Sequence, residues 1–281
     1  MTATAYEGAA AGAKPGRSLW RRLRHHALSF YAALALGYLL LPIAVVVAFS
    51  FNAPAGRFNF TWQGFTLDNW LHPFAYPGLR DALKVSIEIA VLSSLIATAL
   101  GTLMALALAR YRFRGAGLTN VLIFVPLTTP EIVMGASLLA LFVHWGVPQG
   151  FGTILIAHVM FNISYVVVTV KARLAGFDRH LEEAAMDLFA NEWTTFFRVT
   201  FPLILPGIVS AALLAFALSI DDFVITYFNA GSTTTFPLFV WGAARVAVPP
   251  QINVIGSMIF FLAVGAMLVN VAVQSRRGAR A

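Results

Sequence analysis

Residues 171–206 read KARLAGFDRHLEEAAMDLFANEWTTFFRVTFPLILP and separate two apolar runs, 152–170 and 206–228. The segment carries acids, bases and aromatic side chains, whereas each flanking run is long enough to cross a bilayer as a helix, which takes about 20 residues. A polar segment between two membrane spans is exposed to water, where a soluble protein can bind it. The segment therefore indicates function, and the apolar runs indicate location.

The composition of the whole chain predicts a membrane protein. Of its 281 residues, 59% are hydrophobic and 11% are charged, whereas a soluble domain carries about 25% charged residues. Besides the two runs already named, four more are long and apolar: 29–51, 83–109, 120–143 and 254–274. The apolar part of the first is about 21 residues, longer than that of a secretory signal peptide, so we interpret it as a retained span. The sequence predicts an all-α polytopic membrane protein with six transmembrane helices.

The distribution of positive charge predicts the orientation of these spans. Lys and Arg concentrate in the cytoplasmic loops of membrane proteins. Most of the 19 in this chain fall in the amino-terminal segment, the second and fourth connections and the carboxyl-terminal segment. The opposite side has only Arg57, Arg80, Lys84 and Arg245. Both termini are therefore predicted to be cytoplasmic, and the net charge of +7 is a topology signal rather than a sign of nucleic-acid binding.

Four parts follow from this topology. They are a cytoplasmic amino-terminal tail, the first span with a turn-rich outer loop, a core that contains the cytoplasmic loop 171–206, and a cytoplasmic carboxyl-terminal tail: residues 1–28, 29–81, 82–275 and 276–281. The first 16 residues show no periodic pattern and are predicted to be disordered. Pro126 and Pro130 predict a bend in the third span. The chain has no cysteine, which excludes disulfides and thiol chemistry.

The cytoplasmic loop is predicted to contain two short helices. Asp178 is placed to cap a helix from Arg179 to about Leu188, and Asn191 is placed to cap a second. An apolar stripe at helical spacing marks the first helix: Leu181, Ala184, Ala185 and Leu188. Its acids are predicted to lie toward the other side: Glu182, Glu183 and Asp187. One face of the second helix is predicted to carry Trp193, Phe196, Phe197 and Thr200. Such a pair either docks on a soluble partner or rests on lipid headgroups.

Polar residues also occur deep in the third and fourth spans. Glu131 lies about 16 Å into the third span at 1.5 Å per helical residue, and Asn162 reaches a similar depth in the fourth. A charge at the bilayer centre costs about 2.5–3.5 kcal/mol on insertion scales, so it faces a cavity or a partner. The two residues either line a translocation path or hydrogen-bond to each other.

Asp221 and Asp222 lie in the outer third of the fifth span. Adjacent residues of a regular helix point in different directions, so we expect one to face the path and the other to face a cation such as Lys84 or Arg245. Aromatic faces attract cations as well, and four aromatic residues are near in sequence or side: Phe223, Tyr227, Phe228 and Trp241. The alternative is an outer gate closed by salt bridges, with no substrate contact.

The motif Glu183-Ala184-Ala185, followed after 13 residues by Val199-Thr200-Phe201-Pro202, resembles the EAA loop of ABC importer permeases. In that family the loop sits in a groove of the cytoplasmic ATPase and transmits its closure. The resemblance implies that this segment couples to an ATPase through Glu183, Ala184, Ala185, Asp187, Phe189, Arg198 and Pro202. It also implies the ABC type I importer permease fold, in a bacterial inner (plasma) membrane.

Further similarity points to one subgroup of these permeases. It covers residues 59–66, 111–115, 130–133 and 216–223. Together these segments resemble the second permease subunit of spermidine/putrescine importers. One departure is clear, because the family pattern expects Gly six residues after Glu183, and Phe189 stands there. Either the turn takes another route, with Asn191 sharing the bend, or coupling is altered.

The leading hypothesis is a non-catalytic membrane subunit of an ATP-driven importer, with a polyamine as its substrate. Its partners are a related permease subunit, an ATPase dimer and an external substrate-binding protein. The chain has no P-loop, so no cofactor is expected on it and ATP with Mg belongs to the ATPase. The substrate path is predicted to include Glu131, Asn162, Asp221, Asp222 and Tyr227.

Other functions stay open at this point. The same class of permease carries other small solutes, and a self-sufficient cation channel or secondary transporter would need no ATPase. An intramembrane enzyme is less well supported, because no HExxH or GxSxG motif occurs. His144 and His158 are interpreted as interfacial or buried polar residues rather than metal ligands.

Overall fold

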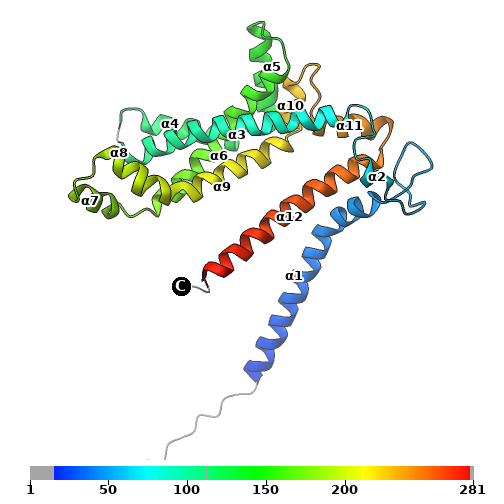
Figure 1. The fold of residues 1–281 in the computed structure, drawn as a ribbon, viewed down its shortest axis with the longest axis horizontal. Coiled ribbons are helices and arrows are strands. Elements are labelled where there is room, and N and C mark those ends of the chain that lie inside the picture. The colour runs from blue at the N-terminus through cyan, green and yellow to red at the C-terminus, as the bar shows by residue number, and fades with distance from the viewer. Residues whose placement is uncertain (1–15, 112, 279–281) are drawn as a thin grey trace, which may run out of the picture. The chain divides into compact units, whose positions relative to one another are not determined.

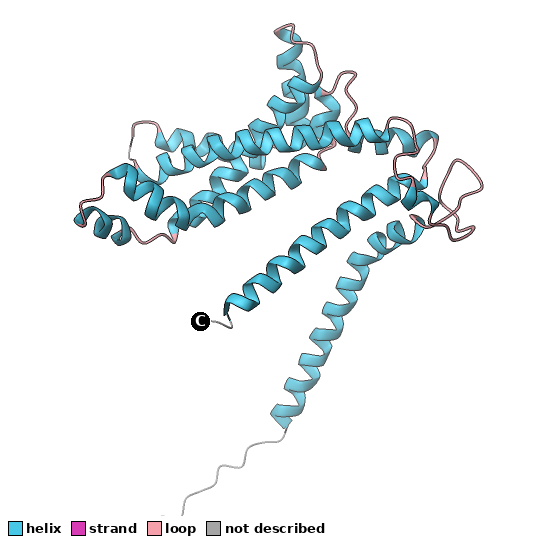
Figure 2. Ribbon diagram, in the orientation of Figure 1, coloured by secondary structure: helices cyan, strands magenta, loops and turns pink. Residues whose placement is uncertain are grey.

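The computed structural model describes residues 16–111 and 113–278, and the predictions made for residues 1–15, 112 and 279–281 lie outside it. The described part is built from helices and turns, with an isolated bridge between Asn52 and Phe65 (Figures 1 and 2). The predicted all-α class is confirmed. The chain forms two compact units, one from the residues up to Pro73 together with those from Pro250 onward, and one from Phe74–Pro249.

The first unit contains α1 (Gly16–Phe49), α2 (Asp68–Leu71) and α12 (Pro250–Gly278), and α12 contacts both of the others. The outer loop after α1 is turn-rich, as predicted. The Asn52 amide organises it by donating to Asn59 Oδ1 at 2.6 Å and accepting from the Gln63 backbone at 2.8 Å. These bonds satisfy polar groups in a loop that lacks regular secondary structure.

The second unit is a bundle of longer helices with short ones at its ends. In chain order its elements are α3 (Leu79–Arg110), α4 (Ala116–Thr128), α5 (Glu131–His144), α6 (Phe151–Ala175), α7 (His180–Asp187), α8 (Glu192–Thr195), the π-helix η1 (Phe196–Thr200), α9 (Phe201–Ile220), α10 (Val224–Asn229) and α11 (Phe236–Val246). Figure 1 shows α3, α6 and α9 side by side, and all three pairs are in contact. The short helices α7 and α8 lie at one end of this bundle.

Small residues on α3 allow the bundle to pack closely. Ala97, Gly101 and Ala105 repeat every four residues, and both alanines are fully buried. A Cβ at Gly101 would lie 2.7 Å from Val166 Cγ1 on α6, closer than real atoms approach. Membrane helices use such small residues where their backbones approach one another. Val166, Val167 and Val170 fill the space that the small side chains leave.

Four helical stretches are long and apolar enough to cross a membrane: Ala27–Phe49, Leu79–Arg110, Phe151–Ala175 and Glu192–Ile220. The pair α4 and α5 makes a fifth if it is one bent span, and the apolar stretch Pro250–Gly265 of α12 is shorter. The six-span count and the cytoplasmic position of both termini therefore stay predictions.

The third span bends as predicted, and the fifth span is broken where the sequence predicted a continuous helix. Between α4 and α5 the axis turns by 109°, at Thr129–Pro130, because Pro130 has no N–H to continue the helix and disfavours a helical residue before it. Pro126 stays inside α4. The fifth span ends at Ile220 and resumes at Val224, so a regular helix through Asp221 and Asp222 is wrong. The Asp222 carboxylate accepts the Thr226 backbone N–H at 2.8 Å, which starts a new helix.

Candidate functional site

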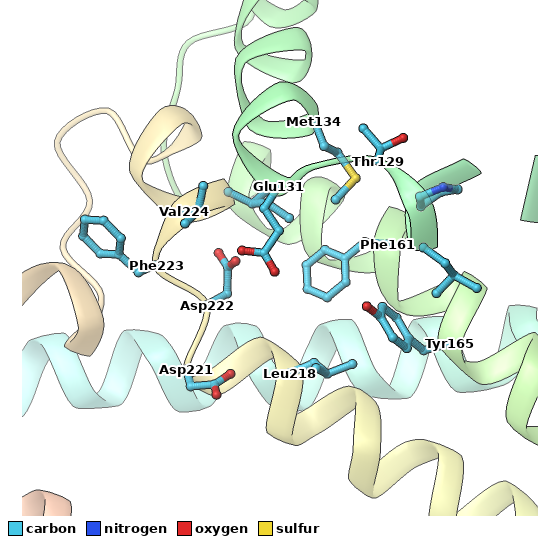
Figure 3. A pocket seen from close by; sticks show the side chains of 13 residues that line it. Thr129, Glu131, Met134, Phe161, Tyr165, Leu218, Asp221, Asp222, Phe223 and Val224 are labelled. Carbon is cyan, nitrogen blue, oxygen red and sulfur yellow. The ribbon is translucent and has the colours of Figure 1, made fainter. Parts of the chain in front are cut away.

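The two breaks meet at a cavity of about 380 Å³ (Figure 3). Its walls come from the end of α4, the start of α5, the middle of α6 and the residues between α9 and α10. Three carboxylates line it: Glu131, Asp221 and Asp222. Residues on two sequence segments far apart therefore converge because both helices are interrupted at the same place.

Each carboxylate owes its position to a helix end. Glu131 is the first residue of α5, where the helix dipole stabilises a negative charge. Asp221 is the C-cap residue that follows Ile220, the last residue of α9, and it is exposed. The contact between α5 and α10 fixes the breaks together, since Asn229 donates to the Gly135 carbonyl at 3.3 Å. In Figure 3 the carboxyl groups of Glu131 and Asp222 turn toward the same part of the cavity, and Asp221 lies farther along the wall beside Leu218.

Asp222 has a partner that the sequence did not predict. Its Oδ2 lies 3.3 Å from His158 Nε2 on α6, and its side chain is 7% exposed. The predicted partners are engaged elsewhere, because Lys84 Nζ lies 3.8 Å from Glu88 and the Arg245 guanidinium lies 4.6 Å from the Trp241 ring centroid. The expectation of a Lys84 or Arg245 pair is therefore wrong. His158 is buried, as predicted, whereas His144 is exposed.

Two residues predicted for the path do not line this cavity. Asn162 is fully buried, and among the described residues its amide atoms have no hydrogen-bond partner, so the alternative of a Glu131–Asn162 bond is not observed. Tyr227 is 57% exposed and packs against Phe223 and Phe228, at 5.6 and 5.8 Å between ring centroids. Phe223 is the aromatic residue of this group that reaches the cavity.

In the coupling segment, which we define as residues 178–202, one of the two predicted caps is observed. Asn191 Oδ1 accepts from the Thr194 backbone at 2.8 Å and caps α8, whereas Asp178 Oδ1 accepts from the His180 backbone at 3.0 Å but Arg179 is the N-cap residue of α7. The second short helix therefore begins where the sequence predicted, and the first begins one residue later, at His180. The predicted coupling residues Glu183, Ala184, Asp187, Arg198 and Pro202 are exposed, and Ala185 is half-buried. His180 Nδ1 lies 3.0 Å from Glu183 Oε2, and this hydrogen bond, with the charge of Asp178, raises the pKa of His180.

Glu182 faces the bundle, which corrects the prediction that it lies with the other acids on the solvent side. Its Oε1 accepts from Arg110 Nη2 and from Thr200 Oγ1, and Arg110 also contacts Thr200 at 3.3 Å. The three residues connect the end of α3, α7 and η1. Thr200 is fully buried, while Trp193 and Phe197 are exposed, so the predicted common face is wrong. The π-helix adds residues per turn and rotates Thr200 inward.

Phe189 makes the turn between the two short helices in the conformation that glycine would take. Its φ is +63°, and it is the one non-glycine residue of the described part with a positive φ. The turn therefore keeps its route, and the alternative in which Asn191 shares the bend is not observed. The Phe189 side chain is 99% exposed. Leu188 and Trp193 are also exposed, which leaves an apolar surface at this end of the unit.

Comparison with known proteins identifies the class. The sequence profile of the family described as binding-protein-dependent transport system inner membrane component matches residues 97–276. The chain belongs to this family. It is thus a multi-pass inner-membrane permease, and the predicted resemblance to ABC importer permeases is confirmed.

Named relatives of this permease are polyamine transport proteins. The spermidine/putrescine transport system permease protein PotC of Escherichia coli (strain K12) is 39% identical over 226 residues, which cover 80% of this chain and 85% of PotC. PotC of Haemophilus influenzae (strain ATCC 51907 / DSM 11121 / KW20 / Rd) is 38% identical over 83% of this chain and 90% of its own length. The putrescine transport system permease protein PotI of Escherichia coli (strain K12) is 38% identical, covering 80% of this chain and 83% of PotI.

Solved structures support the fold. A chain of a bacterial ABC transporter involved in the import of the acidic polysaccharide alginate superposes with a TM-score of 0.65 at 13% identity, over 92% of this permease and 99% of that chain. A chain of an amino acid ABC transporter gives a TM-score of 0.56 at 16% identity, over 76% and 100%. These likenesses confirm the predicted ABC importer permease fold.

Sequence reasoning missed the contacts of His158 and Glu182, and the sequence held a usable signal for His158 only. His158 is a polar residue inside an apolar span, so the rule that singled out Glu131 applies to it equally. Glu182 was assigned by the stripe of apolar neighbours alone. The basic residue Arg110, which ends α3 in the chain, is the partner that the stripe does not reveal.

Proposed function

We propose that this permease imports a polyamine such as spermidine or putrescine, driven by ATP hydrolysis in a separate ATPase. The observation that carries the proposal is the cavity lined by Glu131, Asp221 and Asp222. Its supporting context is the similarity to permeases named for spermidine and putrescine transport. A chain that carries a sugar or another neutral solute has no need of three carboxylates on one cavity.

The cavity suits an organic cation with more than one ammonium group. Among the described residues, Glu131 and Asp221 accept no side-chain hydrogen bond and form no ion pair, so both are available to a cation. Two carboxylates that share a site repel each other unless a cation or a proton lies between them. Phe161, Tyr165 and Phe223 supply aromatic surface on the same walls, and such faces attract ammonium groups.

The coupling segment is proposed to dock on the ATPase. In this arrangement the chain pairs with a related permease subunit, two ATPase subunits bind the cytoplasmic side, and an external binding protein delivers the substrate. ATP and Mg belong to the ATPase, and this chain contributes no catalytic residue. The support for docking is the exposed position of Glu183, Phe189 and Trp193 at one end of the unit.

Uptake by membrane vesicles tests the substrate assignment. Vesicles contain the assembled transporter with ATP inside, and labelled putrescine is added with the binding protein. Glu131→Gln and Asp221→Asn are expected to lower uptake by tenfold or more, because each removes a charge that the cation contacts. Asp81→Asn, which removes an exposed carboxylate on α3 that does not line the cavity, is the matched control and keeps normal uptake. Equal uptake by all three variants would contradict the proposal.

A second variant tests the docking assignment separately. Glu183→Arg reverses an exposed charge on α7 and leaves the bundle contacts of Glu182 in place. It is expected to abolish ATP-driven uptake while the protein still inserts in the membrane. Persistent uptake would show that this face does not couple to the ATPase, and uptake without any ATPase would favour a channel or secondary transporter.

A further inference from the structure

His158 is a buried side chain at the centre of the second unit, and the proposed transport function does not use it directly. It is 1% exposed on α6, and its ring contacts Ser219 on α9, Thr226 on α10 and Asp222 in the break between these helices. Nδ1 lies 2.6 Å from Ser219 Oγ, and Nε2 lies 2.9 Å from Thr226 Oγ1 and 3.3 Å from Asp222 Oδ2. A polar ring so placed has no exposed surface with which to bind substrate itself.

The hydrogen bonds around this ring are consistent with one direction of donation. Ser93 on α3 donates to Ser219 at 3.0 Å, so Ser219 is free to donate its own proton to His158 Nδ1. With its proton on Nε2, His158 donates to Thr226 Oγ1 at 2.9 Å, and the same nitrogen lies 3.3 Å from Asp222 Oδ2. Thr226 donates to the same Oδ2 from both its hydroxyl and its backbone, each at 2.8 Å. The hydrogen bonds from Ser93 through Ser219, His158 and Thr226 therefore all run toward Oδ2 of Asp222.

The other oxygen of Asp222 is left for the cavity. Within the described part of the chain, Oδ1 has no hydrogen-bond donor, and Figure 3 shows this carboxyl group turned toward the space that Glu131 faces. Carboxylates in a site of low dielectric are effective when their orientation is fixed before the ligand arrives. Asp222 sits on an irregular stretch between two helices, so the backbone alone does not fix its side chain.

We propose that His158 is a positioning residue that holds Asp222 at the break between α9 and α10, so that Oδ1 and Glu131 form a pre-set pair for one ammonium group of the cargo. This inference rests on the proposed cation site and assigns different roles to its two neighbouring aspartates. Asp222 is oriented from behind by α6, whereas Asp221 is exposed and unsupported. Loss of the His158 donor would release Asp222 without removing any charge from the cavity.

Thiol protection in the assembled transporter tests this inference. The chain has no cysteine, so Thr129→Cys places a single thiol of this chain on the cavity wall. A cationic and a neutral methanethiosulfonate reagent are applied with and without putrescine. We expect putrescine to slow modification of this thiol. His158→Phe, which keeps a planar ring and removes the donor, is expected to weaken that protection about tenfold, as when a charged group loses a hydrogen bond. His158→Gln, which keeps a donor, restores most of it.

Controls separate the possible failures. Thr61→Cys, exposed in the outer loop, reports reagent reactivity away from the cavity and is expected to be insensitive to His158. If putrescine does not protect the thiol at position 129 in the otherwise unchanged chain, the proposed cation site itself is wrong. If it protects equally with His158→Phe, the site stands and the positioning role is overturned. Should His158→Phe fail to accumulate in the membrane, Ser219→Ala, which removes the donor to Nδ1, is expected to weaken protection by a smaller factor, and unchanged protection overturns the inference.

Discussion

Phe189 holds a backbone conformation that costs free energy, and replacing it with glycine is predicted to stabilise the coupling segment locally. A non-glycine residue in the left-handed region costs about 1–2 kcal/mol, and its φ here is +63°. The side chain is 99% exposed, so its removal loses almost no packing. The greater flexibility of glycine in the unfolded segment offsets about 0.5–1 kcal/mol of this stabilisation. The net gain is about 0.5–1 kcal/mol, a two- to fivefold shift in local opening.

Amide hydrogen exchange measures this opening directly. The Ala190 amide donates to the Ala185 carbonyl at 3.2 Å across the turn, so its exchange requires the turn to open. In the solubilised transporter, Phe189→Gly is expected to slow exchange at Ala190 two- to fivefold after correction for intrinsic rates. Phe189→Ala is the matched control, because it removes the same ring and keeps the backbone cost. Equal exchange in the two variants would refute the argument from backbone strain.

Three further predictions concern other parts of the second unit. Glu182→Gln removes the ion pair between Glu182 (16% exposed) and Arg110 (29% exposed), which connects α7 to α3. This variant is expected to lower the amount of solute transported per ATP hydrolysed, and the double exchange Arg110→Glu with Glu182→Arg is expected to restore part of it. An unchanged ratio of solute to ATP in Glu182→Gln would contradict a coupling role for this ion pair. Gly101→Ala forces a Cβ to within 2.7 Å of Val166 and is expected to destabilise the bundle by about 1–3 kcal/mol, measured as a lower Tm. Gly117→Ala, whose Cβ would have nothing within 4 Å, is the control and is expected to leave Tm unchanged. Equal shifts of Tm in the two variants would contradict close packing of α3 against α6 at Gly101. The raised pKa of His180 means that its charged form is favoured in folded α7. This contribution to α7 stability is therefore present below the usual His pKa and lost as pH rises through the raised value. An NMR titration of His180 is expected to give a higher midpoint than in an unfolded peptide, and His180→Gln is expected to remove the pH dependence of α7 protection from hydrogen exchange; equal midpoints would contradict the hydrogen bond to Glu183.

The fold class and the starts of the two short helices, to within one residue, were predictable from the sequence because they depend on local chemistry. Apolar runs of membrane length, together with Asp178 and Asn191 at the starts of short helices, need no knowledge of distant residues. The break at Pro130 was predicted as a bend for the same reason, but its angle of 109° depends on how α5 packs against α10.

The site was predictable in its acids but not in its geometry. Glu131, Asp221 and Asp222 were singled out because charge is costly inside a bilayer. The convergence of these three carboxylates on one cavity was not predictable, because a regular helix through Asp221 and Asp222 would point the two side chains in different directions. The regular helix ends there, and Asp222 instead accepts the Thr226 backbone N–H and lies beside His158, a contact between residues far apart in the sequence. Asn162 shows the reverse case, because it was predicted to line the path but is fully buried and does not line the cavity.

Reconstitution with purified components tests the central claim most directly. The wild-type permease is placed in proteoliposomes with its partner permease, the ATPase and the binding protein, and the accumulation of labelled putrescine is measured against a neutral solute of similar size. We expect putrescine to accumulate only when Mg-ATP reaches the ATPase, and the neutral solute not to accumulate. Accumulation without ATP, or equal accumulation of the neutral solute, would contradict ATP-driven import of a polyamine.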